Sequence, residues 1–321
     1  MGDIVPESRF HLRQQPAEIR KDPILDRWSI ISPERARRVI PPDGKLPVCP
    51  FCAGNEEETL AEVEAIRPLG SSPNDSRWLI RVVPNLYPAL RMASQIEIDF
   101  QGLFEKRLGS GNHEVIIECP HHETSLAQLS PEHLGLLMQV WKDRLLVHRE
   151  NQDLRYGMIF KNQGTDAGAS LEHCHSQLLT LPMIPGTIRE ELDAGEEYFS
   201  RYACCLFCEL LKQERDDESR VIWEDADFVA FAAYAGRFPF ETWIFPKSHH
   251  SHFEDSTSEE LNQLGSCLHA VLKKLQVGLH DPPLNIVLQN APLHAPCSPS
   301  FHWHLGWPCA LACSTRRWRP S

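Results

Sequence analysis

Cysteine and histidine pairs recur along this chain at spacings that suit metal binding. A Cys-x-x-Cys pair occurs twice, first as Cys49 and Cys52 and again as Cys205 and Cys208. Two thiolates on one tight turn can hold a single tetrahedral zinc ion, which then needs two more donors from elsewhere in the chain. Histidines follow each pair at similar distances, so both halves of the sequence can supply a closed set of four ligands.

We therefore predict two structural zinc sites. Their ligands are Cys49, Cys52, His122 and His173 in the first half, and Cys205, Cys208, His249 and His302 in the second. His121 and His250 stand beside chosen donors and remain open alternatives, whereas Cys204 lacks the spacing of Cys205. The competing interpretation of each pair is a redox dithiol, which we expect to follow a buried strand and open a helix. Residues 41–47 (PPDGKLP) predict a loop, and the duplicated pattern favours zinc.

Residues 162–177 (NQGTDAGASLEHCHSQ) form the segment most informative about catalysis. On an extended backbone His173 and His175 point the same way, so a metal can hold one ring while the other faces a ligand. A neutral imidazole attacks phosphorus well when one ring nitrogen is held as N–H and the other faces the substrate. A lone His-x-His is more often a metal site or buried packing, but the glycine-rich lead-in and Gln177 favour a nucleophile here.

Gln177 also indicates which kind of leaving group the substrate has. Its amide can donate a hydrogen bond to a non-bridging phosphoryl oxygen, but the amide cannot titrate. A histidine at this position could protonate a leaving group. Its absence favours a leaving group that is already good, such as the sugar phosphate of a nucleotide sugar.

The elements that must position these residues occur in the same order in both halves. Apolar runs predict strands at 28–31, 78–83, 115–118 and 156–161, and again at 221–223, 228–232, 242–245 and 285–289. Ser130 caps one predicted helix, and Ser256 or Thr257 caps another with Glu259 or Glu260 in the capping-box position. The apolar faces of both helices follow the helical period.

The parallel between the halves predicts a duplicated α+β fold. His122 precedes His173 by 51 residues, and His249 precedes His302 by 53. Each unit is expected to be an antiparallel sheet with packed helices. We place the boundary in the polar stretch 191–200, which gives domains of 1–195 and 196–321.

Composition narrows the class of protein. The chain has 321 residues, 42% of them hydrophobic, which is typical of globular proteins rather than disordered or coiled-coil chains. A formal charge of −12 predicts no broad binding to nucleic acid or to an anionic membrane. We see no apolar run long enough to span a bilayer and no secretory signal, so we expect a cytoplasmic protein. Eleven cysteines in a reducing compartment favour metal ligation over disulfides.

Several short motifs together resemble the galactose-1-phosphate uridylyltransferase family of the histidine-triad superfamily, and most closely its plant-type ADP-glucose phosphorylase branch. The motifs are RKDP at 20–23, SPERARR at 32–38, CPFC at 49–52, PNLYPAL at 84–90, FKNQG at 160–164 and HCHSQ at 173–177. The resemblance implies two histidine-triad-like domains, an enzyme and a nucleotidyl-histidine intermediate on His175, assisted by Gln177. It also implies zinc in the first donor set and, for this branch, a second zinc in the other set.

The resemblance further implies which residues contact the nucleotide and its phosphates: Arg35, Arg38, Asn85, Asn162, Gly168 and Ser170. The substrates it implies are a nucleotide sugar with phosphate or a hexose 1-phosphate as acceptor. ADP-glucose with phosphate is our preferred pair, and UDP-glucose with galactose 1-phosphate is the alternative. A homodimer is a further family expectation.

The sequence departs from the family pattern after residue 305. The family continues through another strand and a glycine-rich segment, whereas residues 306–321 read GWPCALACSTRRWRPS. We expect this tail to reduce activity while zinc binding survives. A zinc-stabilised nucleotide-binding protein without turnover is therefore the alternative from another functional class.

Overall fold

A computed structural model describes residues 16–307, except for residues 26, 34, 36–47 and 94–96. Arg38 and residues 308–321 of the divergent tail lie outside the described part. Two antiparallel sheets, four α-helices and several short 3-10 helices make up the described chain. The 3-10 helices include η2 (Glu56–Glu58), η3 (Leu126–Gln128), η4 (Thr165–Ala167) and η5 (Phe253–Asp255).

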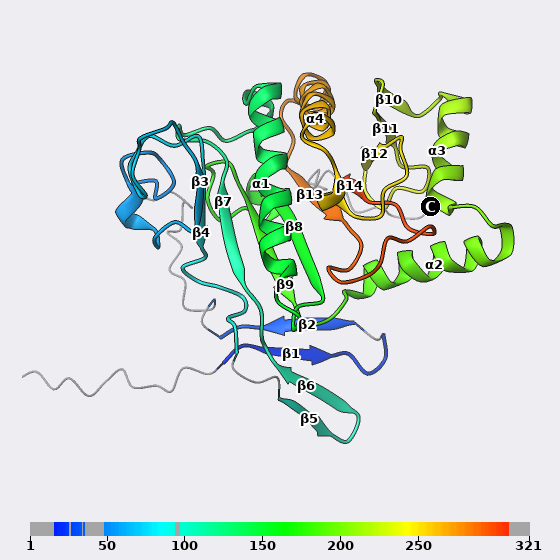
Figure 1. Ribbon diagram of the computed structural model, residues 1–321, viewed down its shortest axis with the longest axis horizontal. Coiled ribbons are helices and arrows are strands. Elements are labelled where there is room, and N and C mark those ends of the chain that lie inside the picture. The colour runs from blue at the N-terminus through cyan, green and yellow to red at the C-terminus, as the bar shows by residue number, and fades with distance from the viewer. Residues whose placement is uncertain (1–15, 26, 34, 36–47, 94–96, 308–321) are drawn as a thin grey trace, which may run out of the picture.

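The larger sheet has ten strands, and its order is a near-mirror repeat (Figure 1). From one edge to the other the strands are β10 (Val221–Glu224), β11 (Phe228–Ala232), β12 (Thr242–Pro246), β14 (His304–Trp307), β13 (Leu284–Gln289), β8 (Tyr156–Gln163), β9 (His175–Leu181), β7 (His113–Ile117), β4 (Ile80–Pro84) and β3 (Glu64–Ile66). Each half contributes five strands in the same chain order, and the halves join where β13 pairs with β8. The duplicated α+β fold is thus confirmed.

Two long helices cover one face of this sheet. The first, α1 (Pro131–Arg149), has the Ser130 side chain as its cap, and the second, α4 (Ser258–Leu279), starts with a capping box of Thr257 and Glu260. Their apolar faces and the sheet residues beneath them form one continuous core. The helices cross so closely that a Cβ on Gly265 would lie 2.4 Å from the main-chain nitrogen of Gly135. The crossing therefore depends on these two glycines.

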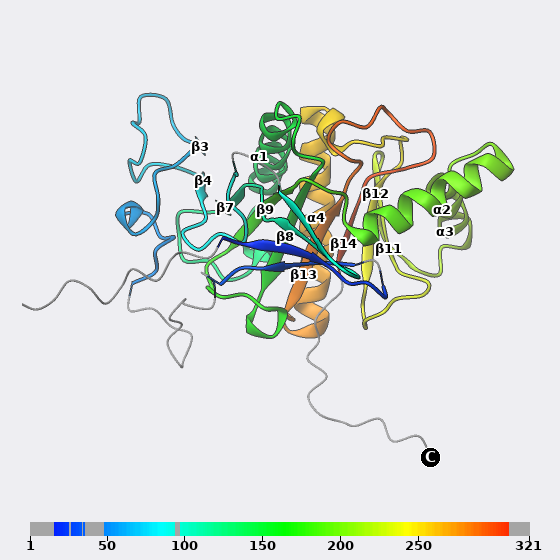
Figure 2. The same ribbon diagram turned by 90° about the horizontal axis from the view of Figure 1, so that it is seen from below.

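The opposite face of the large sheet is covered in parts. A four-stranded sheet, in the order β2 (Trp28–Ile31), β1 (Glu18–Lys21), β6 (Phe104–Leu108) and β5 (Ile98–Gln101), packs with its first two strands against β8 and β9 (Figure 2). Helix α3 (Leu206–Asp217) packs over the second half of the large sheet. The turn that carries Phe51 packs over β4 and β7. Helices α1 and α4 thus cover one face of the large sheet. The site lies on the opposite face, between the parts that cover it.

Residues 186–202 form the helix α2 (Gly186–Tyr202), which the sequence analysis did not anticipate. The proposed boundary at 195/196 falls inside this helix. It stays a proposal for where the first repeat ends and the second begins.

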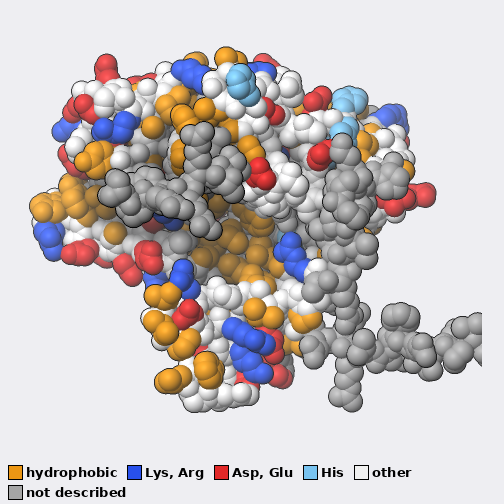
Figure 3. All heavy atoms as spheres, turned by 180° about the vertical axis from the view of Figure 1, so that it is seen from behind, with side chains coloured by type: hydrophobic (Ala, Val, Ile, Leu, Met, Phe, Trp, Pro, Cys, Tyr) orange, Lys and Arg blue, Asp and Glu red, His pale blue; other side chains and the backbone are white. Residues whose placement is uncertain are grey.

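Figure 3 shows hydrophobic side chains on the lobe formed by the small sheet, where Ile98, Phe100, Leu103 and Phe104 are exposed. Within the described ranges, no helix is both long and apolar enough to pass through a bilayer.

Candidate active site and metal centres

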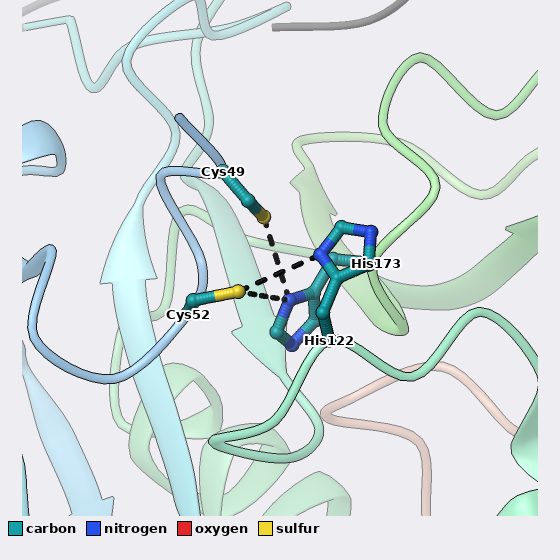
Figure 4. A group of neighbouring side chains, drawn as sticks. All are labelled: Cys49, Cys52, His122 and His173. Atoms are coloured by element: carbon teal, nitrogen blue, oxygen red, sulfur yellow. Dashed lines mark hydrogen bonds between the residues drawn. The ribbon is translucent and has the colours of Figure 1, made fainter. Parts of the chain in front are cut away.

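Cys49, Cys52, His122 and His173 converge on one point, although they come from three separate segments (Figure 4). Their four ligand atoms all lie within 4.8 Å of one another. The Nδ1 atom of His173 is 3.5 Å from the Cys49 sulfur and 3.6 Å from the Cys52 sulfur. The Nδ1 atom of His122 is 3.5 Å from the Cys52 sulfur. All four predicted members of the first donor set are therefore brought together.

The spacing and chemistry of this group fit a metal ion. A tetrahedral ion with bonds of about 2.0–2.3 Å requires donor–donor distances of about 3.3–3.8 Å, and the contacts just described lie in that range. Burial lowers the pKa of His173 to about 4, so its imidazole is neutral as a ligand must be. Its Nε2 lies 2.9 Å from the carbonyl oxygen of Cys119, which holds the proton there and leaves Nδ1 for the metal.

The second group of donors is similar but less closely assembled. The ligand atoms of Cys205, Cys208 and His249 lie within 4.8 Å of one another. The Nδ1 atom of His249 is 3.2 Å from the Cys208 sulfur, whereas that of His302 is 4.0 Å away. Burial lowers the pKa of His302 to about 3, so this ring is also neutral. Three predicted ligands therefore form a group that could hold a metal, and the fourth is adjacent to it.

His175 begins strand β9, next to the first donor group but outside it. Alternation along β9 turns Ser176 toward the helices, where its hydroxyl accepts a hydrogen bond from Trp141. His175 and Gln177 therefore face the other side of the sheet. The Nδ1 atom of His175 lies 2.7 Å from the carbonyl oxygen of His173, and the ring of Phe51 packs edge-on at 5.2 Å between centroids. Both contacts fix the orientation of the imidazole.

A cavity of about 430 Å³ lies over this face of the sheet. Of the residues predicted to bind or react with a nucleotide, four line it: Asn85, Ser170, His175 and Gln177. Its apolar walls include Val48, Phe51 and Leu60, which suit a planar base or a sugar ring. The cavity is large enough for much of a nucleotide, and its one histidine among the described lining residues is His175.

Three other predicted contacts are not among the described residues that line the cavity. Arg35 is exposed. The Asn162 side chain accepts a hydrogen bond from Asn285 at 2.7 Å, across the junction of β8 and β13. Gly168 is exposed and ends η4 with a φ of 86°, a left-handed conformation that favours glycine. Their roles as nucleotide contacts remain predictions.

Two buried features next to the site escaped the sequence analysis. His113, at the start of β7, lies 2.9 Å from Gln177 through its Nε2 atom. Lys161 is buried with Glu118 at 2.6 Å and also donates to the main-chain carbonyl of His175. His113 belongs to no recognisable motif, and Lys161 is part of the motif FKNQG with no role assigned to it. The antiparallel pairing of β7, β8 and β9 brings both residues beside the segment of His173 and His175.

The arrangement can support attack by an imidazole on an electrophile held in the cavity. The carbonyl of His173 can hold the proton of His175 on Nδ1, and this tautomer places the ring's lone pair on Nε2. Gln177 and Asn85 supply amide groups on the same cavity wall. These are the parts that nucleophilic catalysis on a phosphate ester needs.

Comparison with known proteins gives a consistent result. Residues 8–185 match the family model described as galactose-1-phosphate uridyl transferase, N-terminal domain. The chain is 36% identical to an ADP-glucose phosphorylase of Arabidopsis thaliana over 92% of this chain and 84% of that protein. It is 28% identical to a galactose-1-phosphate uridylyltransferase of Thermotoga maritima, over 90% of this chain and 85% of the relative.

Solved structures agree with the sequence relatives. An ADP-glucose phosphorylase from Arabidopsis thaliana with bound ADP-glucose superposes with a TM-score of 0.72 at 34% identity, covering 94% of this chain and 91% of that one. A structure described as uridylyltransferase gives a TM-score of 0.77 at 27% identity, covering 91% of this chain and 86% of the other. The likeness therefore extends over both halves of the fold.

Proposed function

The chain belongs to the galactose-1-phosphate uridyl transferase family, and from this premise we propose that it is a nucleotidyltransferase that uses His175 as its nucleophile. The preferred reaction converts ADP-glucose and phosphate into ADP and glucose 1-phosphate. The similarity to an ADP-glucose phosphorylase at 36% identity supports this choice of substrates.

The placement of His175 carries the proposal. Its Nδ1 atom lies 2.7 Å from the carbonyl oxygen of His173, while the ring itself lines the cavity. A main-chain carbonyl can only accept, so it holds the proton on Nδ1 and leaves Nε2 as the nucleophilic nitrogen. The same carbonyl stabilises the positive charge that the ring gains when it forms a bond through Nε2.

The reaction proceeds in two displacements. Nε2 of His175 forms a bond to the α-phosphorus of ADP-glucose, and the bond from that phosphorus to the oxygen of glucose 1-phosphate breaks. An oxygen of inorganic phosphate then attacks the same phosphorus, and the N–P bond breaks to release ADP. Each step exchanges one bond at phosphorus for another, so no oxidant or external acid is needed.

The surrounding residues position the ligand and stabilise charge. Gln177 donates an amide N–H to a non-bridging phosphoryl oxygen as negative charge develops there. Asn85 and Ser170 also line the cavity, which supports the proposal that they contact the nucleotide. We propose zinc in both cysteine–histidine groups, because two thiolates and imidazoles form its preferred tetrahedral set. When bound in the first group, zinc fixes the segment that holds His173 and therefore the neighbouring His175.

The reaction is tested by intact-mass measurement of the zinc-loaded chain. The protein is incubated with ADP-glucose, or separately with UDP-glucose, without an acceptor, and His175→Ala serves as the control. We expect an AMP adduct on the wild type and none on the variant. Adding phosphate should then discharge the adduct as ADP.

Other outcomes select the alternatives. A UMP adduct discharged by galactose 1-phosphate identifies a hexose-1-phosphate uridylyltransferase, which the uridylyltransferase relatives support less strongly. No adduct with either nucleotide sugar, in a folded and zinc-loaded chain, refutes the transferase. A zinc-stabilised nucleotide-binding protein would then be the better description.

A further inference from the structure

His113 lies directly behind Gln177 and is not itself among the described residues that line the cavity. It is the first residue of β7 and is 4% exposed. Its Nε2 atom is 2.9 Å from Oε1 of Gln177, and its Nδ1 atom is 2.8 Å from the main-chain nitrogen of Ala89. Both ring nitrogens are thus engaged from opposite sides.

These two contacts determine where the ring proton lies. The main-chain N–H of Ala89 can only donate, so Nδ1 of His113 must accept and carries no proton. Burial lowers the pKa of His113 to about 4, with Arg35 contributing in the same direction, so the ring is neutral near pH 7. A neutral imidazole has one N–H, which is therefore on Nε2 and points at Gln177.

The proton position also determines the orientation of the Gln177 amide. An N–H on His113 requires an acceptor, so the oxygen of Gln177 must face it. With the amide turned the other way, two N–H groups would face each other at 2.9 Å in a partly buried setting, and both would lose a hydrogen bond. The Gln177 oxygen is therefore held away from the reacting phosphate, and its NH2 group is the end left for the substrate.

The orientation of the Asn85 side-chain amide is also determined by its hydrogen bonds. Its side-chain oxygen accepts from the main-chain nitrogen of Tyr87 at 2.9 Å, so its NH2 group is the end that lies 3.2 Å from Nε2 of His113. Because that Nε2 already carries a hydrogen, it cannot accept from Asn85. The NH2 group of Asn85, which lines the cavity, is therefore left to donate to an acceptor other than the His113 ring.

We propose that His113 is a positioning residue that orients the Gln177 amide, so that the cavity presents N–H donors and no amide oxygen to the phosphoryl group. The inference rests on the proposed function and adds a specific residue to it. A preset donor costs no reorganisation when charge develops on the phosphoryl oxygens. An amide free to rotate would present its oxygen to that charge part of the time.

The second half of the fold offers an internal comparison. His304 occupies the position that corresponds to His175, and its Nδ1 is 3.2 Å from the carbonyl oxygen of His302. The strand register, however, places Gly306 where Gln177 lies in the first half. Phe245 stacks on the His304 ring at 4.5 Å, and the ring is 3% exposed. The half that lacks the glutamine also has its histidine covered by aromatic rings.

The test compares two substitutions that separate the contacts of His113. Asparagine places its side-chain oxygen near the Nδ1 position, so His113→Asn keeps an acceptor for Ala89 but cannot reach Gln177. Glutamine reaches the Nε2 position, so His113→Gln keeps a donor for Gln177. The rate of adduct formation from ADP-glucose is measured for each variant and for Gln177→Ala, with zinc content and urea unfolding as structural readouts.

We expect His113→Asn to slow adduct formation by about 10²-fold, as removal of a charge-stabilising donor does, and His113→Gln to restore most of that loss. In a Gln177→Ala background, His113→Asn should have no further effect, because the amide it orients is gone. A rate for His113→Asn equal to that of the wild type overturns the proposal. So does an equal loss in both backgrounds, which indicates a structural role.

The proton position is tested without substrate. Nitrogen NMR of the zinc-loaded full chain with labelled histidine should show His113 neutral, with hydrogen on Nε2. A charged ring or hydrogen on Nδ1 overturns the inference whatever the activity. A wild-type chain that forms no adduct instead overturns the proposed function, and the role of His113 with it.

Discussion

Removing the ammonium group of Lys161 should strongly destabilise the fold. The Lys161 side chain is 1% exposed and its Nζ lies 2.6 Å from Oε2 of Glu118, whose side chain is 0% exposed. Burial by itself lowers the pKa of Lys161, but the interactions with neighbouring acidic groups, Glu118 first among them, together raise it. The ammonium also donates to the carbonyl of His175 at 3.2 Å. The Lys161 ammonium therefore contacts both Glu118 and the first residue of β9, the strand that begins with His175.

The magnitude follows from what Lys161→Met leaves behind. The methionine keeps most of the apolar stem, so little packing is lost. The carboxylate of Glu118 loses its countercharge, and its Oε1 atom already has no hydrogen-bond partner among the described residues. Breaking a buried ion pair in this way costs about 3–5 kcal/mol. Replacing both partners, as in Glu118→Met with Lys161→Met, should return the stability to within about 1 kcal/mol of the wild type.

Urea unfolding at constant free zinc, followed by circular dichroism, measures both effects. Urea is uncharged and does not screen the ion pair as guanidinium would. The slope of free energy against urea concentration must stay constant for the comparison to hold. A Lys161→Met chain within about 1 kcal/mol of the wild type refutes the reasoning. A double variant less stable than either single variant also refutes it, because the loss would then come from packing.

Three further predictions concern the metal, the helix crossing and the pH dependence of stability. His173→Ala should lose the first metal ion and His175→Ala should retain it, as measured by elemental analysis, because Nδ1 of His173 lies within 3.6 Å of both thiols. Gly265→Ala should lower the unfolding free energy in urea by about 1–3 kcal/mol, since the added Cβ overlaps α1. Burial raises the pKa of Glu191 to about 7, so the folded chain retains a proton that the unfolded chain releases. Stability should therefore fall by up to about 1.4 kcal/mol per unit as pH rises from about 5 to about 7, and urea unfolding of Glu191→Gln should lack this slope.

Matched variants provide the controls. Gly278→Ala lies in the same helix with open space around its Cβ, so it should stabilise the chain by about 0.5–1 kcal/mol. Glu190→Gln, on the exposed neighbour of Glu191, removes only the smaller contribution of the Glu190 charge to the raised pKa, so most of the pH slope should remain. Equal metal content in the two histidine variants would contradict the division of roles. A stable Gly265→Ala chain would contradict the close crossing, and an unchanged slope in Glu191→Gln would contradict the burial argument.

The sequence predicted the elements whose patterns are local. The strand at 28–31 and the caps at Ser130 and Thr257 are found where they were expected, because alternation and capping are set by neighbouring residues. The cysteine–histidine groups were also predictable, since a tight turn fixes two donors and histidines follow each cysteine pair at similar distances. The duplicated order of elements then followed from the repeated motifs.

Other features depend on contacts that no short segment encodes. Helix α2 has a narrow apolar stripe in a polar sequence, so residues 191–200 suggested a boundary rather than a helix. The strands β5 and β6 lie largely outside the core and show no clear alternation. His113 is a single histidine with no motif, and its role arises only from the register that places it near Gln177. Asn162 is engaged by Asn285 from the other half, which no local pattern reveals.

The pairing of β8 with β13 has a consequence for how the molecule loses its structure. Because one sheet and one core run through both halves, neither half can open without exposing apolar surface of the other. We therefore expect the two halves to unfold together, so that metal bound at either candidate centre would stabilise the whole described fold. Metal bound by Cys205, Cys208 and His249 would then also stabilise the half that holds the cavity. The second half thus stabilises the half with the cavity through the shared sheet, without needing a second chain for that purpose.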